Sequence, residues 1–202
     1  TMRSERAVYK NKSGEGNYSA GMIGFSYRST NVVSIGIAYF TREEAQSIPV
    51  SHSFYVVDAN TIIEAEAEGV IMSDPKKYFN EPYIHVFFKK PIHLNPDYVK
   101  IMTDYALSLV GKPYDWGLFL NFLWQWIATK LHITISKKSP PLLDNPNWMM
   151  CSEVSASTLS QIPEYSNLDP LSEWHPARIS PLKLFSSPIF EPWRFTNETT
   201  AP

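Results

Sequence analysis

The sequence predicts a single α+β domain in which strands come first and helices follow. Short β-rich runs lie between residues 20 and 91, and helix-like segments with capping and stop signals occupy much of the chain beyond them. The chain has 202 residues, of which 44% are hydrophobic, and this suits one folded domain with a sizeable core. We therefore expect a flexible segment over 1–19 and one domain over 20–202, with an antiparallel sheet packed against helices.

The strand predictions rest on β-branched and aromatic runs that are bounded by turn residues. A short buried strand is expected in AGMIGFSY, which begins at Ala20. The segment over 51–70 is expected to form a hairpin with its turn at 58–60. A third strand is expected in YIHVFFKKP, which begins at Tyr83.

Helices are predicted where apolar spacing coincides with capping or stop signals. The first, over 29–45, has apolar residues at helical spacing after a capping serine or threonine. The second, over 96–110, is followed by Gly111 and Pro113, which are stop signals. The third, CSEVSASTLSQI, begins near Cys151.

An apolar run, WGLFLNFLWQWIATK, begins at Trp116 and opens a predicted insertion over 116–147. A membrane span needs about 20 apolar residues, so a buried helix or a hydrophobic flap fits this run better. Membrane or lipid contact through 116–127 is the less favoured alternative. The part from Pro163 onward is rich in proline and aromatic residues and is expected to wrap the surface.

Charge and cysteine content exclude several classes of function. The formal net charge is −2, and no Lys/Arg cluster of the kind that follows phosphates is present, so we expect no nucleic-acid partner. The single cysteine excludes an internal disulfide and a four-thiolate zinc site, and we expect no metal and no cofactor. The first residues lack the apolar stretch of a signal peptide, which favours a cytoplasmic protein unless a leader has been removed.

Cys151 is the candidate nucleophile because the third predicted helix begins there. Backbone N–H groups and the dipole at a helix N-terminus favour a thiolate, and the same N–H groups can form part of an oxyanion hole. The alternative is that Cys151 is a small buried hydrophobic residue, which is the commoner role of a lone cysteine.

A thiol nucleophile also needs a base, and the base needs a partner that orients it. Among five histidines, His52 is the candidate base because it begins a predicted strand that would hold its ring at the edge of a cleft. The hairpin places Glu64 and Glu66 near His52 on one face, and either could hold the Nδ1 proton of His52. The alternatives are a structural histidine and glutamates that only protect an edge strand.

Together these segments resemble the YiiX-like branch of the NlpC-type cysteine peptidase superfamily, whose members carry a circularly permuted papain-like fold. The histidine and glutamate precede the cysteine here, as the permuted branch requires. The matching segments, in chain order, are GMIGFS at Gly21, VSHSFYVV at Val50, IIEAEAEGV at Ile62, LVGKPYDW at Leu109, MCSEVSAS at Met150 and RISPLKLFSSPIF at Arg178.

The resemblance implies a role for each candidate residue. Cys151 would be the nucleophile, His52 the general base and later acid, and Glu64 the residue that orients His52. Tyr114 and Ser51 are weaker candidates for the oxyanion site or for substrate contact.

Three further features bear on the match to the family. Met22 stands where the family usually has an aspartate, and the segment over 116–147 is long for it. Asp115 is expected only to brace the turn at the start of that segment.

Three functions remain open on these grounds. The first is a cysteine amidase or peptidase that cleaves an amide bond through a thioester, with cell-wall peptides as the substrate class that the superfamily suggests. The second is a lipid or acyl-chain hydrolase or acyltransferase of the lecithin–retinol acyltransferase type, which shares the fold. The third is a non-catalytic binding or structural module on the same fold.

Overall fold

The computed structural model describes residues 18–30, 50–80, 83–115, 117, 124, 127–128, 131–132, 136–141, 145 and 147–192. The helix predicted over 29–45 and most of the flexible segment predicted over 1–19 lie outside these residues. Most of the insertion predicted over 116–147 also lies outside them.

The described chain has an α+β fold built on a five-stranded antiparallel sheet with the strand order β4-β3-β2-β1-β5. The hairpin of β2 and β3 lies at its centre and turns at residues 58–60, as predicted. The strands are β1 (Ile23–Arg28), β2 (His52–Val56), β3 (Ile62–Glu66), β4 (Gly69–Ser73) and β5 (Ile84–Lys89). The sequence reading missed β4, which follows β3 after two turn residues and therefore looked like the end of a single strand.

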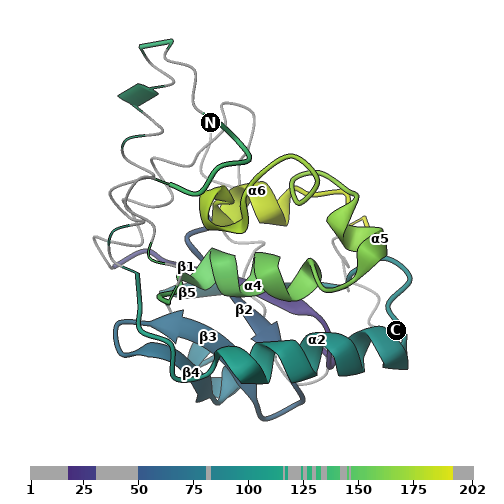
Figure 1. Cartoon of the computed structure of the whole chain (residues 1–202). Helices are drawn as coiled ribbons and strands as arrows, with labels where there is room; N and C mark the ends of the chain where they lie inside the picture. Colours follow the sequence, from purple (N-terminus) through teal and green to yellow (C-terminus); the bar gives the residue numbers. More distant parts are fainter. Residues whose placement is uncertain are drawn as a thin grey trace, which may run out of the picture.

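Helices cover one face of this sheet, and Figure 1 shows α4 lying between α6 and α2 in front of it. The second and third predicted helices are confirmed as α2 and α4. The helices are α2 (Pro96–Leu109), α4 (Cys151–Leu159), α5 (Pro163–Ser166) and α6 (Pro181–Phe185), with 3₁₀ helices η2 (Pro75–Tyr78) and η3 (Pro176–Arg178). No helix among the residues described here is long and apolar enough to cross a membrane.

The two faces of the sheet bury different side chains, because side chains alternate along each strand. Ile23, Phe25, Tyr55 and Ile63 point to the helices and pack with α4 in the larger apolar cluster. A second cluster on the opposite face contains, among others, Phe54, Val56, Ile62, Tyr78 and Phe88. The alternation places His52 and Glu64 on the same side of the sheet as Phe54.

Gly24 allows the second cluster to form. It lies opposite Phe54 in the β1–β2 ladder, and a Cβ atom at this position would come within 2.0 Å of the Phe54 ring. With hydrogen in that place, Phe54 lies across β1 and stacks on Tyr78, with 4.7 Å between ring centroids. The absence of a side chain at Gly24 therefore helps to fix the position of Tyr78.

The prediction that the chain after Pro163 wraps the surface is wrong for much of that segment. Tyr165, Ile179, Leu182 and Leu184 are buried in the larger cluster. Pro163, Pro176 and Pro181 open α5, η3 and α6 at their first turn, where a missing N–H group costs no hydrogen bond. The prediction of a surface-wrapping segment did not include these helix starts.

Candidate active site

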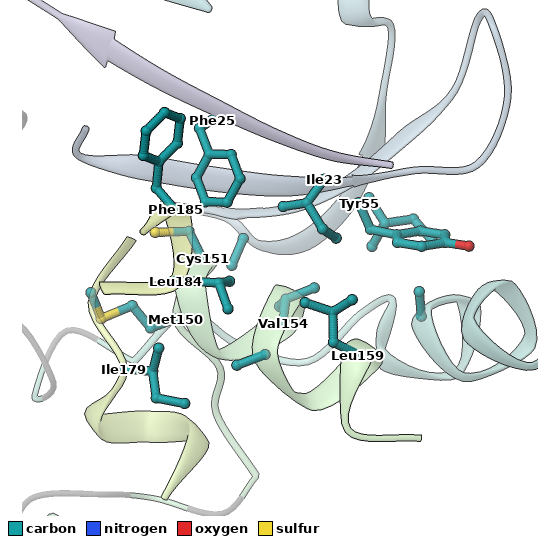
Figure 2. Close-up of a cluster of buried hydrophobic side chains, with 14 of the residues drawn as sticks. Ile23, Phe25, Tyr55, Met150, Cys151, Val154, Leu159, Ile179, Leu184 and Phe185 are labelled. Carbon is teal, nitrogen blue, oxygen red and sulfur yellow. The ribbon is translucent and has the colours of Figure 1, made fainter. Parts of the chain in front are cut away.

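Cys151 is the first residue of α4, as predicted. The helix starts here because Met150 is extended, with φ −104° and ψ 160°, and its N–H donates to the Glu153 carboxylate at 3.4 Å. The Cys151 thiol is reduced and only 1% exposed. Figure 2 shows it in the apolar cluster with Phe25, Phe185 and Met150 labelled around it.

Polar contacts join the start of α4 to the start of β2. The Ser53 hydroxyl lies 3.0 Å from the Ser155 hydroxyl and donates to the Cys151 carbonyl oxygen at 3.4 Å. All of these groups are buried, and buried hydroxyls are usually hydrogen-bonded. Because His52 directly precedes Ser53, these contacts bring the candidate base to the same end of the sheet as the candidate nucleophile.

The structure brings His52 together with both of its predicted partners. Its imidazole lies near enough to the Cys151 side chain for the two to interact electrostatically, and its Nε2 atom lies 3.0 Å from Oε2 of Glu64. The choice between the two glutamates is therefore settled geometrically in favour of Glu64. The prediction that Nδ1 would face the glutamate is wrong, because Glu64 lies diagonally across the hairpin from His52 and meets Nε2.

Burial and the neighbouring groups change the pKa values of His52 and Glu64 in opposite directions. Burial lowers the pKa of His52, but the negative charge and hydrogen bond of Cys151, together with those of Glu64, raise it from 6.5 to about 10. Burial raises the pKa of Glu64, but its interactions with His52 and with Lys77 lower it from 4.5 to about 2. The electrostatics therefore favour an imidazolium at His52 beside a Glu64 carboxylate that is ionised at neutral pH.

Two partners of Glu64 were missed by the sequence reading. The Tyr78 hydroxyl donates to Oε2 of Glu64, and the Lys77 ammonium forms an ion pair with Oε1. Both residues lie on η2, which Asp74 caps by accepting the Lys76 N–H at 2.8 Å. The Asp-Pro pair that opens η2 is a visible helix-start signal, but a four-residue 3₁₀ helix gives no sequence sign of where it will dock.

Asp115 braces the start of the insertion, as predicted. Its Oδ1 atom accepts the Gly117 N–H at 2.8 Å, and Oδ2 accepts the Asn145 N–H at 3.1 Å. Its own N–H donates to the Met149 carbonyl at 3.1 Å, and the Met149 N–H donates to the Pro113 carbonyl at 2.8 Å. The chain on both sides of the insertion is thus held against the residues that lead into α4.

The two weaker candidates lie in different surroundings. Tyr114 forms a parallel backbone bridge with Met149, and burial raises the pKa of its hydroxyl, as do the negative charges of Cys151 and Asp115. Its phenol therefore stays protonated near the thiol. Ser51 is buried, and its hydroxyl donates to the Ser26 carbonyl oxygen at 3.4 Å. The roles predicted for both residues stay predictions.

The described residues of the insertion include exposed apolar side chains. Trp124 is 50% exposed and Leu131 is 63% exposed, whereas Ala128 is fully buried. Trp148, three residues before Cys151, is 40% exposed. Of the two structures predicted for this run, the exposure of Trp124 fits the hydrophobic flap better than the buried helix, and most of its neighbours over 116–127 lie outside the described residues.

Within the part of the chain that the structure describes, no group of three or more His, Cys, Asp or Glu side chains could hold a metal ion. Comparisons with protein-family models, with curated proteins and with solved structures find no match to this chain. The resemblance to the YiiX-like branch therefore stays a prediction.

Proposed function

We propose that the protein is a cysteine hydrolase that cleaves an amide bond through a thioester formed on Cys151. The observation that carries this proposal is that His52, which the fully buried Glu64 carboxylate holds by its Nε2 atom, interacts electrostatically with the Cys151 side chain at the start of α4. A nucleophile in contact with a base, which is itself oriented by a third group, is the arrangement that activates serine and cysteine nucleophiles.

The reaction would proceed in two steps. The Cys151 thiolate attacks the substrate carbonyl, and His52 donates its proton to the leaving amine, so that an acyl-thioester and a neutral histidine remain. His52 then removes a proton from water, whose oxygen attacks the thioester and releases the acid and Cys151. Glu64 keeps the ring in place in both steps and stabilises the imidazolium form.

The start of α4 supplies a donor for the oxyanion. In the described structure the Cys151 N–H donates no hydrogen bond, whereas the Met150 N–H is used by Glu153. A first-turn N–H of this kind lies beside the attacking sulfur and is suited to stabilising negative charge on the substrate oxygen. Tyr114, protonated and near the thiol, is the second donor that we propose.

Access to the sulfur places a condition on this mechanism. The Cys151 side chain is 1% exposed, whereas the His52 side chain is 19% exposed. A substrate would therefore approach from the exposed side of His52 and displace the side chains that cover the thiol. This condition predicts that the thioester forms more slowly with bulky acyl groups than with small ones.

We also propose that the domain is a circularly permuted papain-like fold of the YiiX-like type. The chain order of His52, Glu64 and Cys151, and an antiparallel sheet packed on the helix that the cysteine opens, are what that fold would require. An experimental structure that failed to superpose on papain-like domains after permutation would contradict this assignment.

Intact-mass spectrometry with a library of muropeptides and acyl-amides tests the function. The wild type should turn over at least one member and carry its acyl mass when quenched, whereas Cys151→Ala should do neither. His132→Asn is the matched control, because His132 is exposed and left-handed, a conformation that asparagine tolerates. Equal turnover by wild type and Cys151→Ala would contradict the proposal, and no turnover by either would favour a non-catalytic module.

A second candidate is an acyl-chain hydrolase or acyltransferase, favoured by the exposed Trp124, Leu131 and Trp148 side chains. Exposed tryptophans are frequent where a protein meets an apolar chain or an interface. Matched thioester substrates of short and long acyl chain distinguish the candidates. Preference for the long chain, weakened in Trp148→Ser, would support the second, and preference for the short chain would support the amidase.

A further inference from the structure

We propose that Lys77 and Tyr78 are positioning residues that keep Glu64 ionised and oriented against His52, and that Glu66 holds Lys77 in place for this task. This inference rests on the proposed function, because it assigns how the same site is held. None of these three residues is needed to touch the substrate.

The two carboxylate oxygens of Glu64 contact different partners. Oε2 faces His52 Nε2 at 3.0 Å and also accepts the Tyr78 hydroxyl proton. Oε1 is ion-paired with the Lys77 ammonium, which in turn lies 2.7 Å from Oε1 of Glu66. With both oxygens engaged from separate directions, the carboxylate plane cannot rotate away from His52 without breaking one of these contacts.

The charges alternate along this path. His52 carries a positive charge beside the negative charge of Glu64, and the positive charge of Lys77 lies between those of Glu64 and Glu66. Tyr78 is the remaining ionisable group that faces Glu64, and both its burial and its contact with Glu64 raise its pKa, so it stays a donor. The path runs from His52 through the buried Glu64 to Lys77 and Glu66, which are both half-buried.

Without these donors, Glu64 would be poorly suited to its role. A fully buried carboxylate binds a proton readily unless opposite charge or hydrogen bonds stabilise its ionised form. A protonated Glu64 would no longer stabilise the imidazolium form of His52. Lys77 and Tyr78 therefore control the base through Glu64 and not by contact with it.

The placement of these donors depends on elements remote from the reaction. Tyr78 stacks on Phe54, and η2 is fixed at its start by the Asp74 cap. Glu66 lies two residues beyond Glu64 on β3, so the strand itself sets the distance between the two carboxylates. Both glutamates of EAE therefore have a role in this inference: Glu64 contacts His52, and Glu66 holds Lys77.

Carbon-13 NMR of labelled glutamate carboxyls tests the inference directly, with the Glu64 signal assigned by its absence in Glu64→Gln. In the wild type this signal should stay that of a carboxylate down to about pH 3, and Lys77→Met should raise the proton affinity of Glu64 by about tenfold or more. Tyr78→Phe should change it in the same direction while keeping the ring that stacks on Phe54. Lys77→Arg should restore the wild-type midpoint.

Lys76→Met is the matched control, because Lys76 is the exposed neighbour and its side chain does not contact Glu64. An unchanged Glu64 midpoint in both Lys77→Met and Tyr78→Phe, equal to that of Lys76→Met, would overturn the inference. If Cys151 proves inert while Glu64 titrates as expected, the proposed function fails and the positioning stands. In an active enzyme, the acid limb of the kcat/KM profile should move to higher pH in Lys77→Met.

Discussion

Replacing Glu64 with glutamine should remove the ionised group that the structure holds between His52 and Lys77. Glutamine has nearly the same shape and mimics the protonated acid, so the change removes the charge more than the packing. The pKa of Glu64 is lowered from 4.5 to about 2, because the interactions with His52 and Lys77 outweigh the burial that raises it. At 1.36 kcal/mol per pH unit, this difference corresponds to about 3 kcal/mol of folding stability at neutral pH.

The pH dependence of this loss follows from the direction of the change. A carboxyl group whose pKa is depressed on folding stabilises the protein above the unfolded-state value and loses that contribution as the pH falls through the folded-state value. The difference between wild type and Glu64→Gln should therefore be full above about pH 5 and fall to about half by pH 3.

Urea unfolding at neutral pH and at about pH 3, at one ionic strength, measures both values. Glu68→Gln is the control, because it removes the same charge from an exposed turn and should change stability by no more than about 0.5 kcal/mol. Equal unfolding free energies for wild type and Glu64→Gln at neutral pH would refute the reasoning. So would a difference that stays constant between the two pH values.

Two further substitutions test other parts of the account. Ser53→Ala should cost about 1 kcal/mol in urea unfolding, because it removes the 3.0 Å contact of the buried Ser155 hydroxyl and leaves this group only the Cys151 carbonyl oxygen at 3.5 Å. The same change should slow Cys151 alkylation, and unchanged values of both would contradict the link between β2 and α4. Burial lowers the pKa of Lys89 to about 8, so its cost to folding should diminish as the pH rises from about 8 to 10. The free energy of unfolding of wild type relative to Lys89→Met should therefore increase between these pH values. A difference that does not change with pH would show that burial does not destabilise the Lys89 ammonium, which donates to the Phe185 carbonyl.

The site could be predicted from the sequence to the extent that local patterns determine it. The hairpin turn at 58–60 and the strand period of two place Glu64 within reach of His52, and the start signal of α4 places Cys151 at a helix N-terminus. These features depend on neighbours in sequence, and capping and strand alternation are visible there.

Features that depend on docking could not be predicted in this way. Lys77 and Tyr78 reach Glu64 because η2 folds back over the sheet, and nothing in PKKY indicates that path. The ring nitrogen that meets Glu64 depends on the diagonal offset across the hairpin, and this requires the register to within one residue.

The same limit explains why β4 and the three short helices from Pro163 onward were not predicted. Only two residues separate β4 from β3, and the proline-rich composition of the later segment gives no sign of α5, η3 and α6. In both cases tertiary packing stabilises elements that are too short to give a sequence pattern of their own.

The reactivity of Cys151 tests the central claim most directly, since it is the only cysteine in the sequence and alkylation of the thiol reports on it alone. We expect iodoacetamide at neutral pH to alkylate the wild type much faster than His52→Ala, because His52 is the base that lies beside the sulfur. A wild-type alkylation rate no faster than that of an ordinary free thiol, and equal to that of His52→Ala, would contradict the account.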